Sequence, residues 1–152
     1  MLLFAASLVL PVTDTVWWQT PGGSVTEVHD AKRAECSLTF YDSQQQFVFT
    51  WQRGQPFHGF AVRDDWHFDR NTKMTVNLKI GSHLIANQAA EGADRTIVFL
   101  VGQPIDDLLT DASQITVQTS AAETMIKLPP SSKVAALMVG LHRCRAALNL
   151  PA

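Results

Sequence analysis

Apolar and polar residues alternate in short segments along most of the chain. The clearest segment is 74–80, where Met74, Val76, Leu78 and Ile80 share one face and polar residues occupy the other. Alternation with a period of two is typical of a β-strand that buries one face. Ten candidate segments are present, not all equally clear, and we expect eight or nine short strands from them. Segments of this kind lie at 15–20, 35–41, 46–52, 57–62, 83–87, 96–101, 114–119 and 123–128, with a weaker one at 24–28.

Residues that favour turns separate these segments. The tripeptide 21–23, the tripeptide 42–44 and the dipeptide 81–82 can each join neighbouring strands as a hairpin, and a further turn is expected at 91–94. No helix of the length needed to connect parallel strands lies between them, so antiparallel pairing follows. We therefore expect a mainly β fold, an antiparallel β-sandwich or barrel-like sheet. The nearly continuous apolar run at 96–101 predicts a central strand of that sheet.

The end of the chain has a different period. Apolar residues recur there at spacings of three and four, which is the stripe of an amphipathic helix, and Ser131 or Ser132 can cap its first turn. His142, Arg143 and Arg145 lie off the stripe and suit the negative C-terminal end of a helix. This helix is expected to close the sheet. The stripe consists of Val134, Leu137, Met138, Leu141, Cys144 and Leu148.

The chain contains two cysteines, Cys36 in an alternating segment and Cys144 on the helical stripe. Their spacing resembles no zinc or CxxC pattern. We expect a disulfide that attaches the helix to the sheet, the alternative being two free buried thiols. In the chain-entropy model, closing a loop of this size stabilises the fold by about 4–5 kcal/mol. Such a bond persists in oxidising compartments.

Length and charge limit the classes of function. A chain of 152 residues suits one domain with a substantial core. The formal net charge of -2 supplies no electrostatic basis for binding nucleic acid or an anionic membrane. No phosphate-binding glycine loop or nucleophile elbow is present, so no cofactor is expected.

The apolar N-terminus is interpreted as an export signal. Residues 1–12 are too few to span a membrane, which needs roughly 20 apolar residues. They have the length and composition of a signal-peptide apolar region, although a preceding basic residue and a clean cleavage site are missing. The domains are therefore expected to be a signal-peptide remnant at 1–13 and a single β-rich domain at 14–152. The expected location is periplasmic or secreted, and a first strand or helix is the alternative for 1–12.

The densest group of polar side chains lies between His58 and Asp69. Histidine and aspartate together can ligate a metal ion or transfer protons. A small metal-dependent or acid/base hydrolase using this region is therefore the alternative function. The region lacks a recognised metal-ligand spacing, and its acidic and basic residues balance as in a solvated loop. We expect a surface loop anchored by Trp66 and Phe68.

The same loop supplies the candidate residues for binding a partner, namely Arg63, Asp65, Trp66 and His67. Trp18 is the fifth candidate, because adjacent tryptophans in a strand point to opposite faces and one of the pair 17–18 is expected to be exposed. An exposed strand edge or aromatic patch would instead favour self-association.

The order of these features resembles a known family. A tryptophan segment precedes a cysteine strand and a hairpin array, followed by 105–109, strands at 115–117 and 126–128, and a helix that ends Leu141-His142-Arg143-Cys144. The layout is similar to the invasion-associated locus B type of exported proteins of α-proteobacteria, most closely over 96–144. The resemblance implies an exported β-rich protein without a catalytic centre. We therefore expect a non-enzymatic protein that binds a protein or a cell-envelope component.

Overall fold

The computed structural model describes residues 13–151, and nearly all of the predicted signal segment lies outside this range. The chain forms ten strands and two helices. Their bounds are β1 Thr13–Thr20, β2 Gly23–His29, β3 Ala34–Tyr41, β4 Gln45–Gln52, β5 His58–Arg63, β6 Phe68–Ile80, β7 His83–Asp94, β8 Thr96–Leu100, α1 Asp106–Thr110, β9 Gln114–Gln118, β10 Glu123–Lys127 and α2 Ser131–Ala147.

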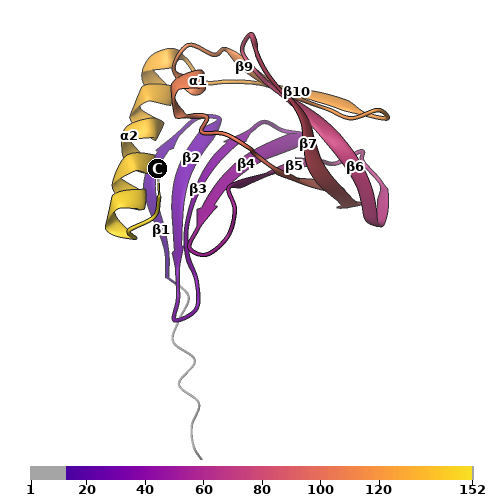
Figure 1. Ribbon diagram of the computed structural model, residues 1–152. Helices are drawn as coiled ribbons and strands as arrows, with labels where there is room; N and C mark the ends of the chain where they lie inside the picture. Colours follow the sequence, from indigo (N-terminus) through magenta and orange to yellow (C-terminus); the bar gives the residue numbers. More distant parts are fainter. Residues whose placement is uncertain (1–12, 152) are drawn as a thin grey trace, which may run out of the picture.

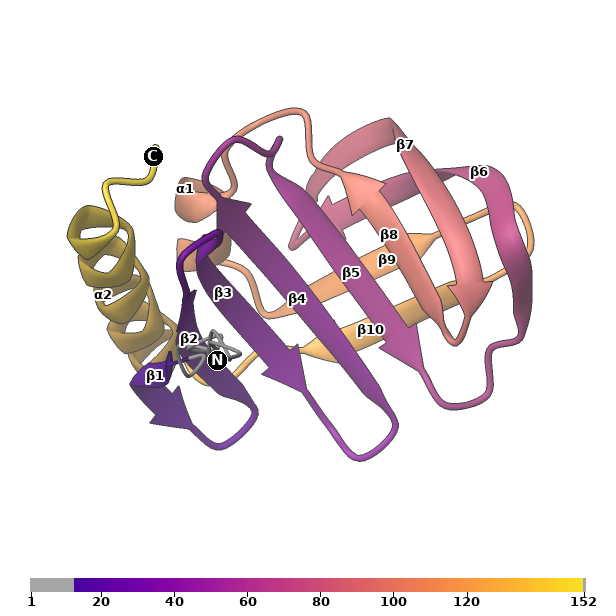
Figure 2. The ribbon, with the colours of Figure 1, turned by 90° about the horizontal axis from the view of Figure 1, so that it is seen from below.

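All ten strands belong to one antiparallel sheet in the order β1-β2-β3-β4-β5-β8-β7-β6-β9-β10. The sheet curls, so that β9 and β10 pass behind β3, β4 and β5 (Figure 2). Helix α2 packs on β1, β2 and β3 at one end, and α1 packs against α2 (Figure 1). The prediction of a mainly β, barrel-like fold with a closing helix is confirmed. The strand count is slightly above the eight or nine expected.

The hairpin of β6 and β7 is longer than the sequence pattern indicated. Residues 91–94, expected to form a turn, belong to β7, and the chain reverses after Asp94, whose φ is 52°. Gly92 is buried in this strand because the side chains of Met74 and Phe68 occupy the space that a Cβ would take, at 2.8 and 3.0 Å. The glycine therefore permits close packing inside a strand, although glycine is more often a turn residue.

The concave side of the sheet holds the core. Strands β3 and β4 contribute the fully buried rings of Phe40, Phe47 and Phe49, and the helix adds Leu137 and Leu141. Alternation along the strands turns these side chains inward, as the pattern predicts. The sequence thus identifies most of the core correctly.

Two details of α2 differ from expectation. Pro130 is the N-cap residue, and no side chain caps the first turn, so neither Ser131 nor Ser132 has the predicted role. Arg145, which lies off the apolar stripe, is only 5% exposed. Its burial arises from tertiary contacts that helical periodicity does not encode.

The curled sheet is closed near one end by side chains. The Gln45 amide at the start of β4 donates to the Met125 carbonyl of β10 at 2.6 Å and accepts from the Thr124 hydroxyl. Arg63 also donates to the Thr124 hydroxyl, at 3.2 Å. These bonds connect β10 to β4 and β5, which are far from it in the strand order.

Candidate functional site

The disulfide attaches α2 to the sheet. Cys36 in β3 and Cys144 in α2 are bonded, with their Cα atoms 6.1 Å apart, a normal separation for a disulfide. Both residues are fully buried. The predicted pairing is confirmed, and no free cysteine occurs among residues 13–151. Such a bond is compatible with a periplasmic or secreted protein.

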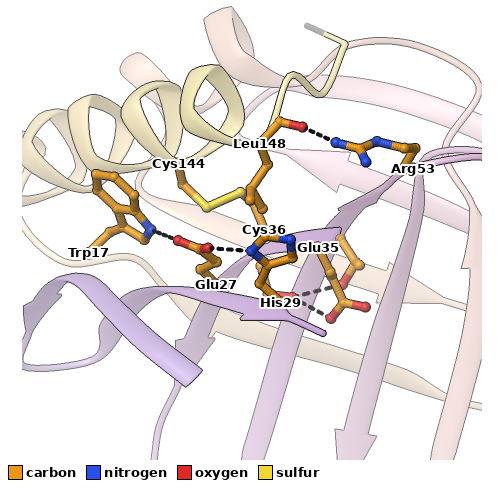
Figure 3. The surroundings of a disulfide bond; sticks show 10 residues. Trp17, Glu27, His29, Glu35, Cys36, Arg53, Cys144 and Leu148 are labelled. Carbon is orange, nitrogen blue, oxygen red and sulfur yellow. Dashed lines mark hydrogen bonds and ion pairs between the residues drawn. A yellow bond between two sulfur atoms is a disulfide. The ribbon is translucent and has the colours of Figure 1, made fainter. Parts of the chain in front are cut away.

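A polar row lies beside the disulfide on the side of the sheet that α2 covers (Figure 3). The Trp17 indole donates to Glu27 at 2.7 Å, and Glu27 also faces the His29 ring at 3.7 Å. Arg53 donates to the Leu148 carbonyl at 2.5 Å, which holds the chain just after α2. The Arg53 bond supports the disulfide in attaching the helix, whereas the contacts of Glu27 join β1 to β2.

The structure places Trp18 at the border between β1 and α2. A bulge between Val16 and Trp18 interrupts the register with β2, so simple alternation of the two tryptophans does not apply. Trp18 is 47% exposed, and its Cβ lies 3.0 Å from the position that a Cβ at Gly140 would take, so it packs closely on α2. Trp18 therefore has both a structural contact and a free surface.

Arg145 is the main polar residue that sequence reasoning did not identify as buried. Its guanidinium donates to Asp106 of α1 at 3.0 Å and lies over the Trp51 ring, 5.1 Å from the centroid. His142 bonds the same Asp106 oxygen at 3.0 Å. The cluster joins α1, α2 and β4. In the sequence, the one indication that Arg145 is buried is its position directly after Cys144, and a basic residue beside a buried one is too common to predict burial.

The predicted binding loop follows β5. Arg63 donates to both oxygens of Asp65, at 2.6 and 3.2 Å. These hydrogen bonds hold the pKa of Asp65 below its ordinary value and raise that of Arg63. Burial opposes ionisation of the nearby Asp42, yet hydrogen bonds from Gln44 and Gln45 hold its pKa below the ordinary value as well. The carboxylates of Asp65 and Asp42 therefore remain ionised to a lower pH than an ordinary aspartate.

The remaining loop candidates differ in exposure. Trp66 is buried and packs edge-on against Phe68 at a centroid distance of 5.5 Å, so it anchors the loop as expected. His67 is exposed. Of the five predicted binding residues, Arg63, Asp65 and His67 present polar groups on this loop, while Trp18 belongs to a different part of the molecule, beside α2.

The region proposed for catalysis does not assemble around one point. His58 bonds the Pro56 carbonyl at 2.9 Å and packs edge-on against Phe60, and within residues 13–151 no hydrogen bond or ion pair joins it to His67. In the same range, no three His, Cys, Asp or Glu side chains are grouped so that they could hold a metal ion.

An apolar surface that the sequence analysis did not identify lies on the outer face of β5, β8 and β7. Strand β8 is central, as expected, but only Ile97 and Phe99 are buried, whereas Val98 is 37% and Leu100 45% exposed. Phe60 is paired directly opposite Val98 and is half-buried. The outer faces of antiparallel sheets are ordinarily polar.

This surface is hollowed into a groove of about 480 Å³. Small residues of β7, Ala89 and Ala93, form one side, and the exposed side chains of β8 form the other. The ion pair between Lys73 and Glu91 lies at the same groove. The outer-face groove, as we call it, combines an apolar floor with one charged pair, which suits contact with another macromolecule.

No helix in the described part of the chain is long and apolar enough to cross a membrane. Comparisons of this chain with models of known protein families, with curated proteins and with solved structures found no match.

Proposed function

We propose that this protein is an exported, non-enzymatic binding domain that holds a protein or a cell-envelope component on its outer-face groove. The observation that carries the proposal is the exposure of Val98 and Leu100 in the middle of the sheet. Apolar side chains at a central, solvent-facing position mark an interaction surface, because nothing in the fold itself requires them there. The polar groups of the 63–67 loop are a second surface for the same purpose.

Export is supported by the buried disulfide and by the apolar segment 1–12. The resemblance to the invasion-associated locus B type of exported proteins stays a prediction that agrees with this proposal. Trapping of free thiols in intact cells tests the location. We expect Cys36 and Cys144 to be protected without reductant, and fully reactive thiols in cells would contradict export.

Binding is tested with the full chain immobilised and exposed to a cell-envelope extract. The variant Val98→Asp/Leu100→Asp places charge on the groove, while Val139→Asp is the control, since Val139 is an apolar residue of comparable exposure, 50% against 37% and 45%, that lies on α2. We expect a component that the native chain and the control retain and the groove variant loses. Equal retention by all three chains, or none by the native chain, would refute the proposal.

A further inference from the structure

A polar hollow lies where the hairpin between β3 and β4 meets the loop after β5. Tyr41, Gln46 and Val62 are neighbours in one row across β3, β4 and β5. Because side chains alternate along a strand and the adjacent Phe40 and Phe47 are buried in the core, this row is on the outer face of the sheet. The hollow has a volume of about 230 Å³, and the hairpin tip 42–45 completes its lining together with the loop.

A second hollow of about 230 Å³ adjoins the first. The two hollows share Gln44 and Asp64, and Asp65 lines the second one as well. We call the two together the hairpin hollow. Each has a size comparable with one pyranose ring and its hydroxyl groups, so the pair has room for two linked sugar units.

The frame of the hairpin hollow is fixed by hydrogen bonds. The Asp42 carboxylate accepts from the backbone N–H groups of Gln44 and Gln45 at 2.8 and 3.1 Å, which holds the hairpin tip. The backbone N–H of Asp64 donates to the Gln44 carbonyl at 3.2 Å, so the loop after β5 is attached to the same tip. The Gln45 side chain is held by β10. Little conformational entropy is therefore lost at this frame when a ligand binds.

The polar groups inside this frame are not used by the fold. Within residues 13–151, no hydrogen bond is formed by the hydroxyl of Tyr41 or by the side chains of Ser43, Gln44 and Gln46. Asp64 has one carboxylate oxygen 3.4 Å from Arg95, and the other oxygen forms no hydrogen bond in the same range. Amides and hydroxyls donate and accept hydrogen bonds, whereas a carboxylate only accepts. A ligand that does both can therefore satisfy all of these groups.

Charge narrows the class of ligand. Both arginines near the hollow are paired, Arg63 with Asp65 and Arg95 with Asp64. Asp42 adds a carboxylate that forms no ion pair within residues 13–151. Phosphate and carboxylate ligands are therefore disfavoured, because like charges repel. A ligand without negative charge suits this hollow.

The ring of Tyr41 adds a second requirement. Tyr41 is 36% exposed, so part of its surface is accessible to a ligand, and Val62 supplies a small apolar area on the far side of Gln46. The face of an aromatic ring carries partial negative charge, which attracts the partially positive C–H groups of a flat ligand. The ligand is therefore expected to combine hydroxyl groups at its edge with a C–H face.

We propose that the hairpin hollow binds a neutral oligosaccharide of at least two pyranose units. A pyranose ring has adjacent hydroxyl groups that donate and accept hydrogen bonds, and it has a face of C–H groups. The amides of Gln44 and Gln46 and the carboxylate of Asp64 bind the hydroxyl groups, and Tyr41 packs on one sugar ring. This inference deepens the proposed function: it rests on the second surface, that of the 63–67 loop, and names the class of ligand held there.

NMR titration of the full chain with soluble sugars tests the proposal. The probes are maltotriose, cellotriose, mannotriose and the trimer of N-acetylglucosamine. An open, polar hollow binds such ligands weakly, with a dissociation constant on the order of millimolar. We expect at least one probe to shift the amide signals of 41–46 and 62–65. No response to any of the four up to about 20 mM, or a response confined to other strands, would overturn the proposal.

Variants of side chains that the fold does not use test the residues. Tyr41→Ala is expected to weaken binding by about five- to tenfold, whereas Tyr41→Phe keeps the ring and most of the affinity. Gln44→Ala loses a hydrogen bond to the sugar and is expected to weaken binding by about fivefold. Gln118→Ala, at an exposed glutamine of β9, is the matched control and should bind as the native chain does. Equal affinity of all four variants would place the sugar elsewhere and refute the site.

The groove variant separates this inference from the proposed role of the groove. Val98 and Leu100 line the outer-face groove and not the hairpin hollow, so Val98→Asp/Leu100→Asp is expected to bind the trisaccharide with native affinity. Loss of sugar binding in this variant would contradict the hairpin hollow as the site. A native chain that retains an envelope component through the groove but binds none of the four sugars would refute this inference alone.

Discussion

Opening the disulfide between Cys36 and Cys144 is expected to remove a large part of the stability of this protein. The bond joins residues separated by 108 positions, and in the chain-entropy model a loop of that size is worth about 5 kcal/mol at 25 °C. Domains of ordinary size are stable by about 5–15 kcal/mol in total. The reduced protein should therefore be marginal, with a melting temperature lower by roughly 10–20 °C.

The assay is chemical unfolding of the full chain, followed by tryptophan fluorescence, with and without reductant. The reduced native chain keeps both sulfur atoms in the core, so its loss of stability measures the cross-link itself. The variant Cys36→Ala/Cys144→Ala adds the cost of smaller side chains in a fully buried position, about 1 kcal/mol more. Its stability should not change with reductant, which makes it the control.

The reasoning would be refuted if reduction lowered the unfolding free energy by less than about 1 kcal/mol. Such a result would mean that the unfolded chain is already constrained, or that α2 is attached by its other contacts alone. Reduction that releases only α2, seen as a partial transition, would instead show that the sheet is stable without its helix.

Two further predictions concern charged groups. Asp106→Ala leaves the guanidinium of Arg145 buried without its carboxylate partner and should lower the free energy of unfolding by about 2 kcal/mol, measured by chemical unfolding. The double variant Asp106→Ala/Arg145→Met should recover most of that loss, because an apolar side chain needs no hydrogen-bond partner. A double variant as unstable as Asp106→Ala would contradict this reasoning. The hydrogen bonds from Arg63 lower the pKa of Asp65, so their contribution to the free energy of unfolding is present above the ordinary aspartate pKa and is lost as the pH falls through the lowered value. In Arg63→Gln, NMR titration should show that the pKa of Asp65 rises. The pKa of Asp30, which is lowered by backbone hydrogen bonds from Lys32 and Arg33, should stay unchanged and is the control.

Much of the fold was predictable because local periodicity reflects burial. The alternation at 74–80 correctly predicts the inward residues of β6, and the helical stripe correctly places Cys144 in the core. The candidate site was less predictable. Trp66 is an anchor because its loop folds back onto the core, and Val98 is exposed although its segment is almost entirely apolar. In both cases the exposed fraction of the side chain depends on which other segments of the chain pack against it, and these are distant in sequence.

The sequence by itself determines the type of most elements, the inward face of most strands and the two cysteines available to join helix to sheet, because these follow from the residues and their spacing along the chain. The tertiary structure alone decides that β8 lies between β5 and β7, that Arg145 is buried against Asp106, and that β10 is left at an edge. These properties arise from contacts between residues far apart in sequence. The curvature of the whole sheet controls such contacts, and no local pattern encodes that curvature.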